Sequence, residues 1–212
     1  MIVHHRDRWI YVAPTKTASS MLHTVLQGQP FFGVDVDPYN QHHMTVPLGL
    51  DDYRLWTTCR NPFGRMASLW RHWCSDCCGN NHEQVVAYAE RHMPFSDFVA
   101  RVDNGSLRRP KWAPKGTPTK FFLRTQAWFW AKLRRGPDAY VQVERLEQEL
   151  AALPWLPADI AKYLPDDLQT RHQTRHLMAA RYTETERQAV MRWAAEDFSI
   201  CKYSTEPTEV EW

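Results

Sequence analysis

Residues 8–26 read RWIYVAPTKTASSMLHTVL. The segment 8–13 is mainly apolar and aromatic, which predicts a buried β-strand. A turn at 14–18 follows, and Ser19 is suited to cap a helix whose apolar residues recur at helical spacing as far as Leu26. A strand that passes through a tight turn into a helix is a building unit of α/β proteins.

The turn between this strand and this helix has the chemistry of a phosphate cradle. It reads Pro14-Thr15-Lys16-Thr17-Ala18-Ser19-Ser20. A tight turn before a helix directs backbone N–H groups toward an anion. Lys16 adds a positive charge and the hydroxyl side chains add donors, although the Walker A pattern G-x-x-x-x-G-K-[ST] is absent. A solvated turn with a capping serine is the alternative, and this segment alone does not decide between the two.

A second strand-to-helix junction reads Cys59-Arg60-Asn61-Pro62-Phe63-Gly64-Arg65-Met66-Ala67-Ser68. We expect a strand at 54–59 and a helix that starts at Pro62, an allowed position for proline. Arg60 then stands at the carboxyl edge of the sheet, where open α/β sheets bind ligands. Its guanidinium can bind a phosphate through two hydrogen bonds, and Ser68 follows two helical turns later. Taken alone, Arg60 and Arg65 would be interpreted as members of surface ion pairs.

The alternation of strands and helices continues along the chain. We expect a third strand at 139–143 and further helices at 83–92, 95–102, 120–133 and 146–153, with a capping box at Thr183–Glu186 opening the last helix. The segment 103–119 is interpreted as a long loop. This order predicts parallel βαβ units. The chain length suits one domain, residues 1–203, and 204–212 is expected to be a tail.

Composition restricts the class of protein. With 43% hydrophobic and 24% charged residues, the 212-residue chain has an ordinary globular composition, and a net charge of +2 argues against a nucleic-acid coat. No apolar run approaches a membrane span, and residues 1–7 lack the apolar region of a signal peptide. Five cysteines, an odd number, do not suit a secreted disulfide framework. We therefore expect a cytoplasmic protein without nucleic-acid or membrane partners.

Together, the two junction motifs resemble those of the sulfotransferases that use 3′-phosphoadenosine-5′-phosphosulfate (PAPS). In that family a loop of the type P-K-T/S-G-T/S-T/S holds the 5′-phosphosulfate, and R-(N/D)-P-x-x-R-x-x-S holds the 3′-phosphate. The resemblance implies that the donor is bound by Thr15, Lys16, Thr17, Ala18, Ser19, Ser20, Arg60 and Ser68. Ala18 stands where the family commonly has glycine, and alanine tolerates a positive φ poorly.

Shorter segments resemble the family in the same order along the chain. They are FSDFV at 95–99, QAW at 126–128, VERLE at 143–147 and DFSICKY at 197–203. The last departs from the family's D-x-x-x-F-G-Y by having Cys201 and Lys202 in place of Phe-Gly. The similarity is greatest to the carbohydrate branch, and it implies a three-layer, P-loop-like α/β fold with a short central parallel sheet. Arg171 and Arg175 lie in the segment that approaches the nucleotide in the family.

The resemblance also implies the reaction. A sulfuryl group passes from PAPS to an acceptor hydroxyl, on a glycan or another small molecule, and adenosine 3′,5′-bisphosphate leaves. Lys16 would stabilise the leaving oxygen, and no metal is needed. His43 would be the general base, because His43-Met44-Thr45 fits the H-x-(T/S/P) pattern of the carbohydrate branch; His42 is the adjacent competitor.

Other interpretations stay open at this point. A kinase with a degenerate phosphate loop would need carboxylates for Mg²⁺, and no convincing pair is found. A non-catalytic nucleotide-binding protein on the same fold is a second alternative. A zinc site at Cys74, Cys77 and Cys78 would lack a second well-spaced cysteine pair, which favours structural thiols. Neither the acceptor nor the oligomeric state follows from the sequence.

Overall fold

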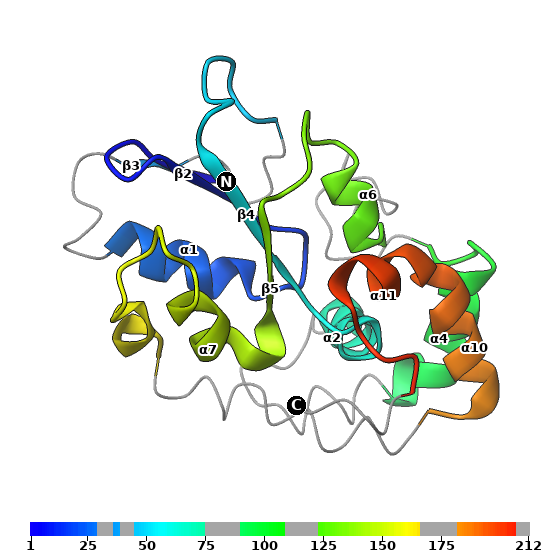
Figure 1. Ribbon diagram of the computed structural model, residues 1–212. Helices are drawn as coiled ribbons and strands as arrows, with labels where there is room; N and C mark the ends of the chain where they lie inside the picture. Colours follow the sequence, from blue (N-terminus) through cyan, green and yellow to red (C-terminus); the bar gives the residue numbers. More distant parts are fainter. Residues whose placement is uncertain (29–35, 39–44, 75–89, 109–122, 166–181, 207–212) are drawn as a thin grey trace. The chain divides into compact units, whose positions relative to one another are not determined.

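The computed structural model describes residues 1–28, 36–38, 45–74, 90–108, 123–165 and 182–206, which fall into two compact units (Figure 1). The first, here called the sheet unit, comprises residues 1–61 and 126–174 with 211–212. The second, called the helical unit, comprises 62–125 and 175–210, and its described elements are helices.

The sheet unit is built around a mixed sheet with the strand order β3-β1-β2-β4-β5. The strands are β1 (Ile2–His4), β2 (Trp9–Val12), β3 (Val36–Pro38), β4 (Arg54–Cys59) and β5 (Ala139–Gln142). Strands β2, β4 and β5 are parallel, whereas β1 pairs in antiparallel fashion with both β2 and β3. The α/β class is confirmed, and the three expected strands are found. The expectation of a parallel sheet was incomplete, because β1 and β3 make the sheet mixed.

Strand β1 was missed because its apolar run is short. It has three residues, Ile2 to His4, and charged residues follow at once. Its pairing fixes it: Val3 lies opposite Ile10 of β2 and Asp37 of β3. The strand is completely buried. Its stability comes from pairing with the neighbouring strands, since three residues are too few to give a strand signal in the local sequence.

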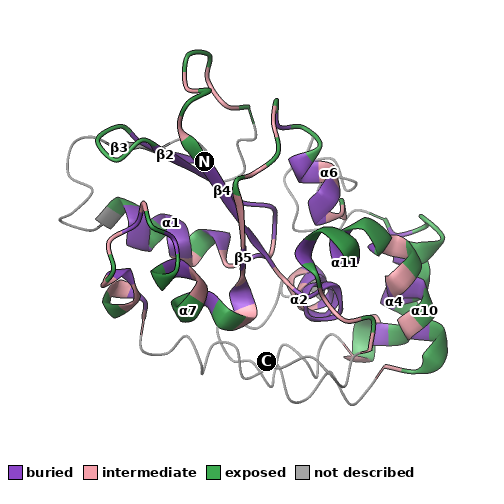
Figure 2. Cartoon of the chain, viewed as in Figure 1, coloured by how far each residue is buried: buried purple, intermediate pink, exposed green. Residues whose placement is uncertain are grey.

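Helices lie on both faces of this sheet (Figure 1). On one face α1 (Ser19–Gly28), α7 (Leu146–Ala151) and the short helix η2 (Ile160–Tyr163) contribute to one apolar cluster with the strands. The strand residues of that cluster are Ile2, Trp9, Tyr11, Trp56 and Val141, and β2 and β4 are buried almost throughout (Figure 2). On the other face α6 (Gln126–Trp130) packs on β4, where the Trp130 indole N–H donates to Thr57 Oγ1 at 3.1 Å.

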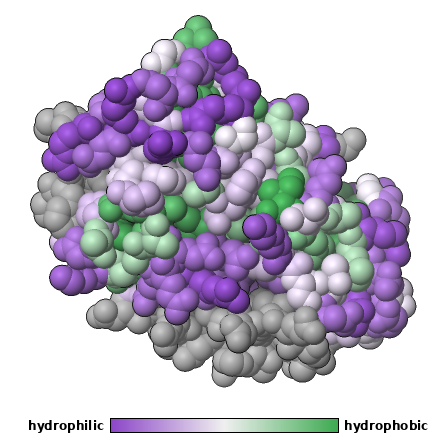
Figure 3. All heavy atoms as spheres, viewed as in Figure 1, coloured by the Kyte–Doolittle hydropathy of each residue, from purple (hydrophilic) through white to green (hydrophobic). Residues whose placement is uncertain are grey.

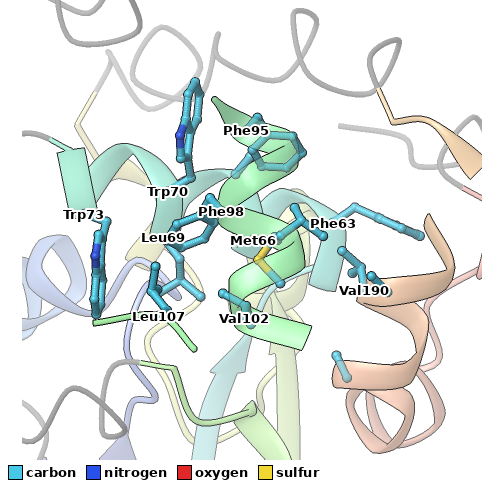
Figure 4. Packing of buried hydrophobic residues seen from close by; sticks show 14 of the residues in the cluster. Phe63, Met66, Leu69, Trp70, Trp73, Phe95, Phe98, Val102, Leu107 and Val190 are labelled. Atoms are coloured by element: carbon cyan, nitrogen blue, oxygen red, sulfur yellow. The ribbon is translucent and has the colours of Figure 1, made fainter. Parts of the chain in front are cut away.

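The helical unit consists of α2 (Pro62–Cys74), α4 (Phe95–Asp103), α10 (Glu184–Trp193) and α11 (Ala195–Cys201). Apolar residues recur at helical spacing along α2, which predicts one buried face. That face is confirmed, because Phe63, Met66, Leu69, Trp70 and Trp73 are all buried. They pack against α4 and α10 (Figure 4). The Trp70 indole donates to the Met93 carbonyl at 2.8 Å, so burying this indole leaves its N–H satisfied.

The helix predicted at 120–133 was too long. The segment predicted at 120–133 is helical only at Gln126–Trp130 within its described residues. The Leu123 carbonyl accepts from the Trp193 indole at 3.1 Å, and the Arg124 carbonyl accepts from the buried Arg65 guanidinium at 2.6 Å. Side chains distant in sequence thus bind carbonyls that a longer helix would use itself.

The capping box that opens the last helix is confirmed. Thr183 Oγ1 accepts from the Glu186 N–H at 3.3 Å, and Glu186 Oε2 accepts from the Thr183 N–H at 2.7 Å. The sequence also predicts that this helix continues to Phe198 and buries Val190, Trp193, Ala194 and Phe198. That continuous helix was wrong, because the helix ends at Trp193 and α11 begins at Ala195 after a break at Ala194, whose φ is −121°. Val190, Ala194 and Phe198 are buried as predicted, whereas Trp193 is only partly buried.

The described surface is largely hydrophilic. On the face shown in Figure 3, hydrophobic residues form small groups between polar ones. Among the described residues, the exposed large hydrophobic side chains are Leu48 and Ile200. No helix in the described part of the chain has the length and apolar character needed to cross a membrane.

Candidate functional site

The carboxyl ends of β2, β4 and β5 lie next to one another at one edge of the sheet. Val12 pairs with Thr57, and Cys59 pairs with Gln142, so the three parallel strands end close to the same level. The loop 14–18 leaves β2 at this edge, and Arg60 follows β4 directly. The sheet unit therefore brings the Lys16 loop and Arg60 to the same edge, as the sequence predicts.

The loop after β2 contains two residues in the left-handed conformation. Lys16 has φ 65° and Ala18 has φ 59°, with Thr17 between them. Helix α1 follows at once, and the Leu22 N–H donates to the Ala18 carbonyl at 3.1 Å. Backbone that alternates between the left- and right-handed conformations can direct successive N–H groups to one side and so bind an anion, and this loop lies next to the positive end of a helix. Side chains other than glycine are strained in this conformation, and such strain is common at functional sites.

A buried hydroxyl network anchors the loop to β4. Thr58 Oγ1 donates to the Thr17 carbonyl at 2.8 Å, and the Thr17 hydroxyl donates to the Pro14 carbonyl at 2.8 Å. The Tyr11 hydroxyl lies 3.0 Å from Thr58 Oγ1 and is the donor there, because the single proton of Thr58 already serves Thr17. Burial raises the pKa of Tyr11, so this hydroxyl stays a neutral donor. The side chain of Thr17 therefore braces the loop from inside.

We expect Ala18→Gly to stabilise the protein. A left-handed alanine costs about 1–2 kcal/mol, and a glycine makes the unfolded chain more flexible at a cost of about 0.4–1 kcal/mol, so the net gain is about 0.5–1 kcal/mol. Denaturant unfolding measures it. The matched control is Ala100→Gly on the exposed face of α4, where the same change should destabilise by about 1 kcal/mol. Destabilisation by Ala18→Gly would contradict the left-handed assignment.

The backbone beyond β4 is held by two side chains. The Arg60 N–H donates to Gln126 Oε1 at 2.7 Å, and Gln126 Nε2 donates to the Arg60 carbonyl at 2.9 Å. The next N–H, of Asn61, donates to Glu144 Oε1 at 3.0 Å. The side chain of Arg60 is half-buried, whereas Gln126 is fully buried. The position of Arg60 at the sheet edge is therefore determined by residues far from it in sequence.

Two carboxylates from the helices after β5 also bind backbone N–H groups: Glu144 in the short helix Val143–Arg145 and Glu149 in α7. Glu149 Oε2 accepts from the Gln142 N–H at 2.7 Å, and Glu144 serves Asn61 as described. Burial raises the pKa of Glu149, and the negative charge of Glu144 raises it further. The hydrogen bond from the Gln142 N–H and the charge of Arg145 lower this pKa but do not cancel the rise. Glu149 thus ties α7 to the end of β5, and Glu144 ties the segment after β5 to the segment after β4.

The predicted site residues differ in how the structure treats them. Within the loop Thr15, Thr17 and Ser19 are buried, Lys16 and Ala18 are half-buried, and Ser20 is exposed. Ser68 is half-buried on α2 of the helical unit, whereas Arg60 belongs to the sheet unit. The predictions for His42, His43, Arg171 and Arg175 lie outside the described residues.

The cysteine cluster falls largely in the same category. Cys77 and Cys78 are outside the described residues, and Cys74 ends helix α2. In the part of the chain that the structure describes, no group of three or more His, Cys, Asp or Glu side chains could hold a metal ion.

Sequence reasoning missed the residues that support the site. The Thr57-Thr58 pair inside a buried strand was an available signal, because buried hydroxyls need hydrogen-bond partners. Gln126 was noted only through its family-like segment, and nothing local indicated that its partner would be Arg60.

Comparison of the chain with protein-family models, curated proteins and solved structures gave no match.

Proposed function

We propose that this chain is a PAPS-dependent sulfotransferase that transfers a sulfuryl group to an acceptor hydroxyl on a carbohydrate or a similar small molecule. One observation carries the proposal: the anion-type loop with Lys16 and the anchored Arg60 leave neighbouring parallel strands at the same sheet edge. An elongated donor with phosphate groups at two positions requires two such cationic sites. Within the α/β class, we propose that the fold is of the three-layer, P-loop-like type.

A second observation supports the resemblance on which this proposal draws. The family has glycine at two positions where this chain has Ala18 and Lys202. Both residues adopt the left-handed conformation, with φ 59° and 56°. Glycine occupies this region without strain, so the backbone meets the same requirement although the residue type differs.

The proposed donor fits the chemistry of the residues present. The loop N–H groups and Lys16 suit the 5′-phosphosulfate, and Arg60 suits the 3′-phosphate together with Ser68. Arg171 and Arg175 are proposed to add to the same positive site. We place the ammonium group of Lys16 near the oxygen that bridges phosphorus and sulfur.

The proposed reaction is a direct displacement at sulfur. The acceptor oxygen forms a bond to sulfur while the bond between sulfur and the bridging oxygen breaks. The acceptor proton passes to His43, and the electron pair of the broken bond stays on adenosine 3′,5′-bisphosphate. Lys16 stabilises the charge that develops on this leaving oxygen.

Donor recognition is tested by comparing two nucleotides that differ in one phosphate. Adenosine 3′,5′-bisphosphate should bind and raise the melting temperature, whereas AMP, which lacks the 3′-phosphate, should bind much more weakly. Arg60→Ala should remove this preference, because it removes the guanidinium. Arg145→Ala, at an exposed arginine after β5, is the matched control and should keep the preference. Equal calorimetric affinities of the wild type for both nucleotides would refute the proposed donor site.

Two further comparisons separate the rival functions. A kinase should prefer ATP to PAPS and require Mg²⁺, whereas the proposed enzyme should bind PAPS without a metal. A non-catalytic binding protein would bind the donor but transfer no labelled sulfate to any member of a glycan panel.

A further inference from the structure

The strongest unassigned feature of the sheet unit is the contact between Gln126 and the backbone of Arg60. The β4–β5 ladder ends with the pair Cys59–Gln142. At the next residue, Arg60, the Gln126 side chain accepts from the N–H at 2.7 Å and donates to the carbonyl at 2.9 Å. Its amide thus repeats the hydrogen-bond pattern of a neighbouring strand for one residue beyond the ladder. Gln126 is 0% exposed, and the two hydrogen bonds join this buried amide to the half-buried Arg60.

The place of this contact in the chain gives it a specific consequence. Asn61 is the last residue before the chain leaves the sheet unit, and Gln126 is the first residue after it returns. The backbone of Arg60 therefore lies where strand pairing has stopped. Without the amide, the partly buried N–H and carbonyl of Arg60 would lose these two hydrogen bonds, and the backbone would relax to replace them. An arginine fork binds phosphate bidentately only from a defined position, so such relaxation would weaken the contact.

We propose that Gln126 is a positioning residue that sets the preference of Arg60 for the 3′-phosphate of the donor. This inference rests on the proposed function. Gln126 makes no contact with the nucleotide in this scheme, and it acts only through the backbone of Arg60. Replacement of Gln126 should therefore weaken the binding of ligands that carry the 3′-phosphate more than the binding of ligands that lack it.

The test compares four proteins by calorimetry with adenosine 3′,5′-bisphosphate and AMP. They are the wild type, Gln126→Leu, Gln126→Glu and the control Asp138→Leu. Asp138 Oδ2 accepts from the Leu55 N–H at 2.7 Å, so the control removes a side chain that holds the backbone of β4 at its opposite end. If Gln126 had a purely structural role, its replacement would weaken the binding of both nucleotides alike. If it is a positioning residue, its replacement changes the ratio of their dissociation constants.

In Gln126→Leu we expect the preference for adenosine 3′,5′-bisphosphate to fall about tenfold, with AMP binding nearly unchanged. In Gln126→Glu one acceptor remains for the Arg60 N–H, but the donor to the carbonyl is lost, so an intermediate preference is expected. Asp138→Leu should lower the melting temperature and keep the wild-type preference. Because glutamate has nearly the size and shape of glutamine, Gln126→Glu decides the matter if the leucine variant does not fold.

The outcomes separate this inference from the proposed function. A wild type without any preference overturns the proposed function itself. A wild type with the preference, together with Gln126 variants that keep it or that weaken both nucleotides equally, overturns the positioning role alone. Loss of the preference in Asp138→Leu would also overturn it, since any disturbance of β4 would then suffice.

Discussion

Lys16→Ala should lower kcat/KM for sulfuryl transfer by about a hundredfold or more, the size seen when one charge-stabilising group is lost. The developing charge on the bridging oxygen needs a cation that is already in place, and the loop places Lys16 beside the start of α1. Alanine keeps the β-carbon and hence the left-handed strain at this position, so the change isolates the ammonium group.

Steady-state kinetics with varied PAPS measure this effect. A lysine that only attracts the donor would raise KM when lost, whereas one that stabilises the leaving oxygen would also lower kcat. Lys132→Ala is the control, because Lys132 is exposed and lies over the Trp128 ring, 5.1 Å from its centre. Unchanged turnover of Lys16→Ala at saturating PAPS would contradict the leaving-group role.

His43→Ala should abolish transfer and leave the binding of adenosine 3′,5′-bisphosphate intact. An alcohol is a poor nucleophile near pH 7, and a neutral imidazole with an ordinary pKa of about 6.5 can take its proton. The adjacent His42→Ala is the natural control. If the chain is extended there, neighbouring side chains point in opposite directions, so only one histidine can serve. Transfer assays with labelled PAPS and calorimetry on the same preparations separate catalysis from binding.

The possible outcomes for the base are distinct. If His42→Ala is inactive and His43→Ala is active, the base is His42. If both variants remain active, the base lies elsewhere, and Glu144 becomes the substitute. In the structure, Glu144 Oε1 accepts from the Asn61 N–H at 3.0 Å. Glu144→Gln keeps an acceptor for this N–H and removes the basicity, so full activity of this variant would exclude Glu144.

The sequence by itself determined several of the local elements and their order along the chain. The strand at 9–12, the turn after it and the helix from Ser19 follow from apolar patterning and capping, which act over a few residues. The apolar face of α2 and the capping box at Thr183 were predictable for the same reason. The candidate residues Lys16 and Arg60 could also be named, because each stands at a strand-to-helix junction whose chemistry is local.

Only the tertiary structure decided which of these elements pair with each other and where the helices end. Strand β1 exists because β2 and β3 pair with it. Among the described residues of the helix predicted at 120–133, only Gln126–Trp130 is helical, and Arg65 and Trp193 bind the carbonyls just before it. The anchoring of Arg60 by Gln126 spans 66 residues of sequence. Hydrogen bonds between residues so far apart in sequence produce no local sequence pattern, because they depend on how the folded chain brings the two segments together. The residues that carry the proposed chemistry were therefore evident from the sequence, whereas those that hold them in place became evident only from the fold.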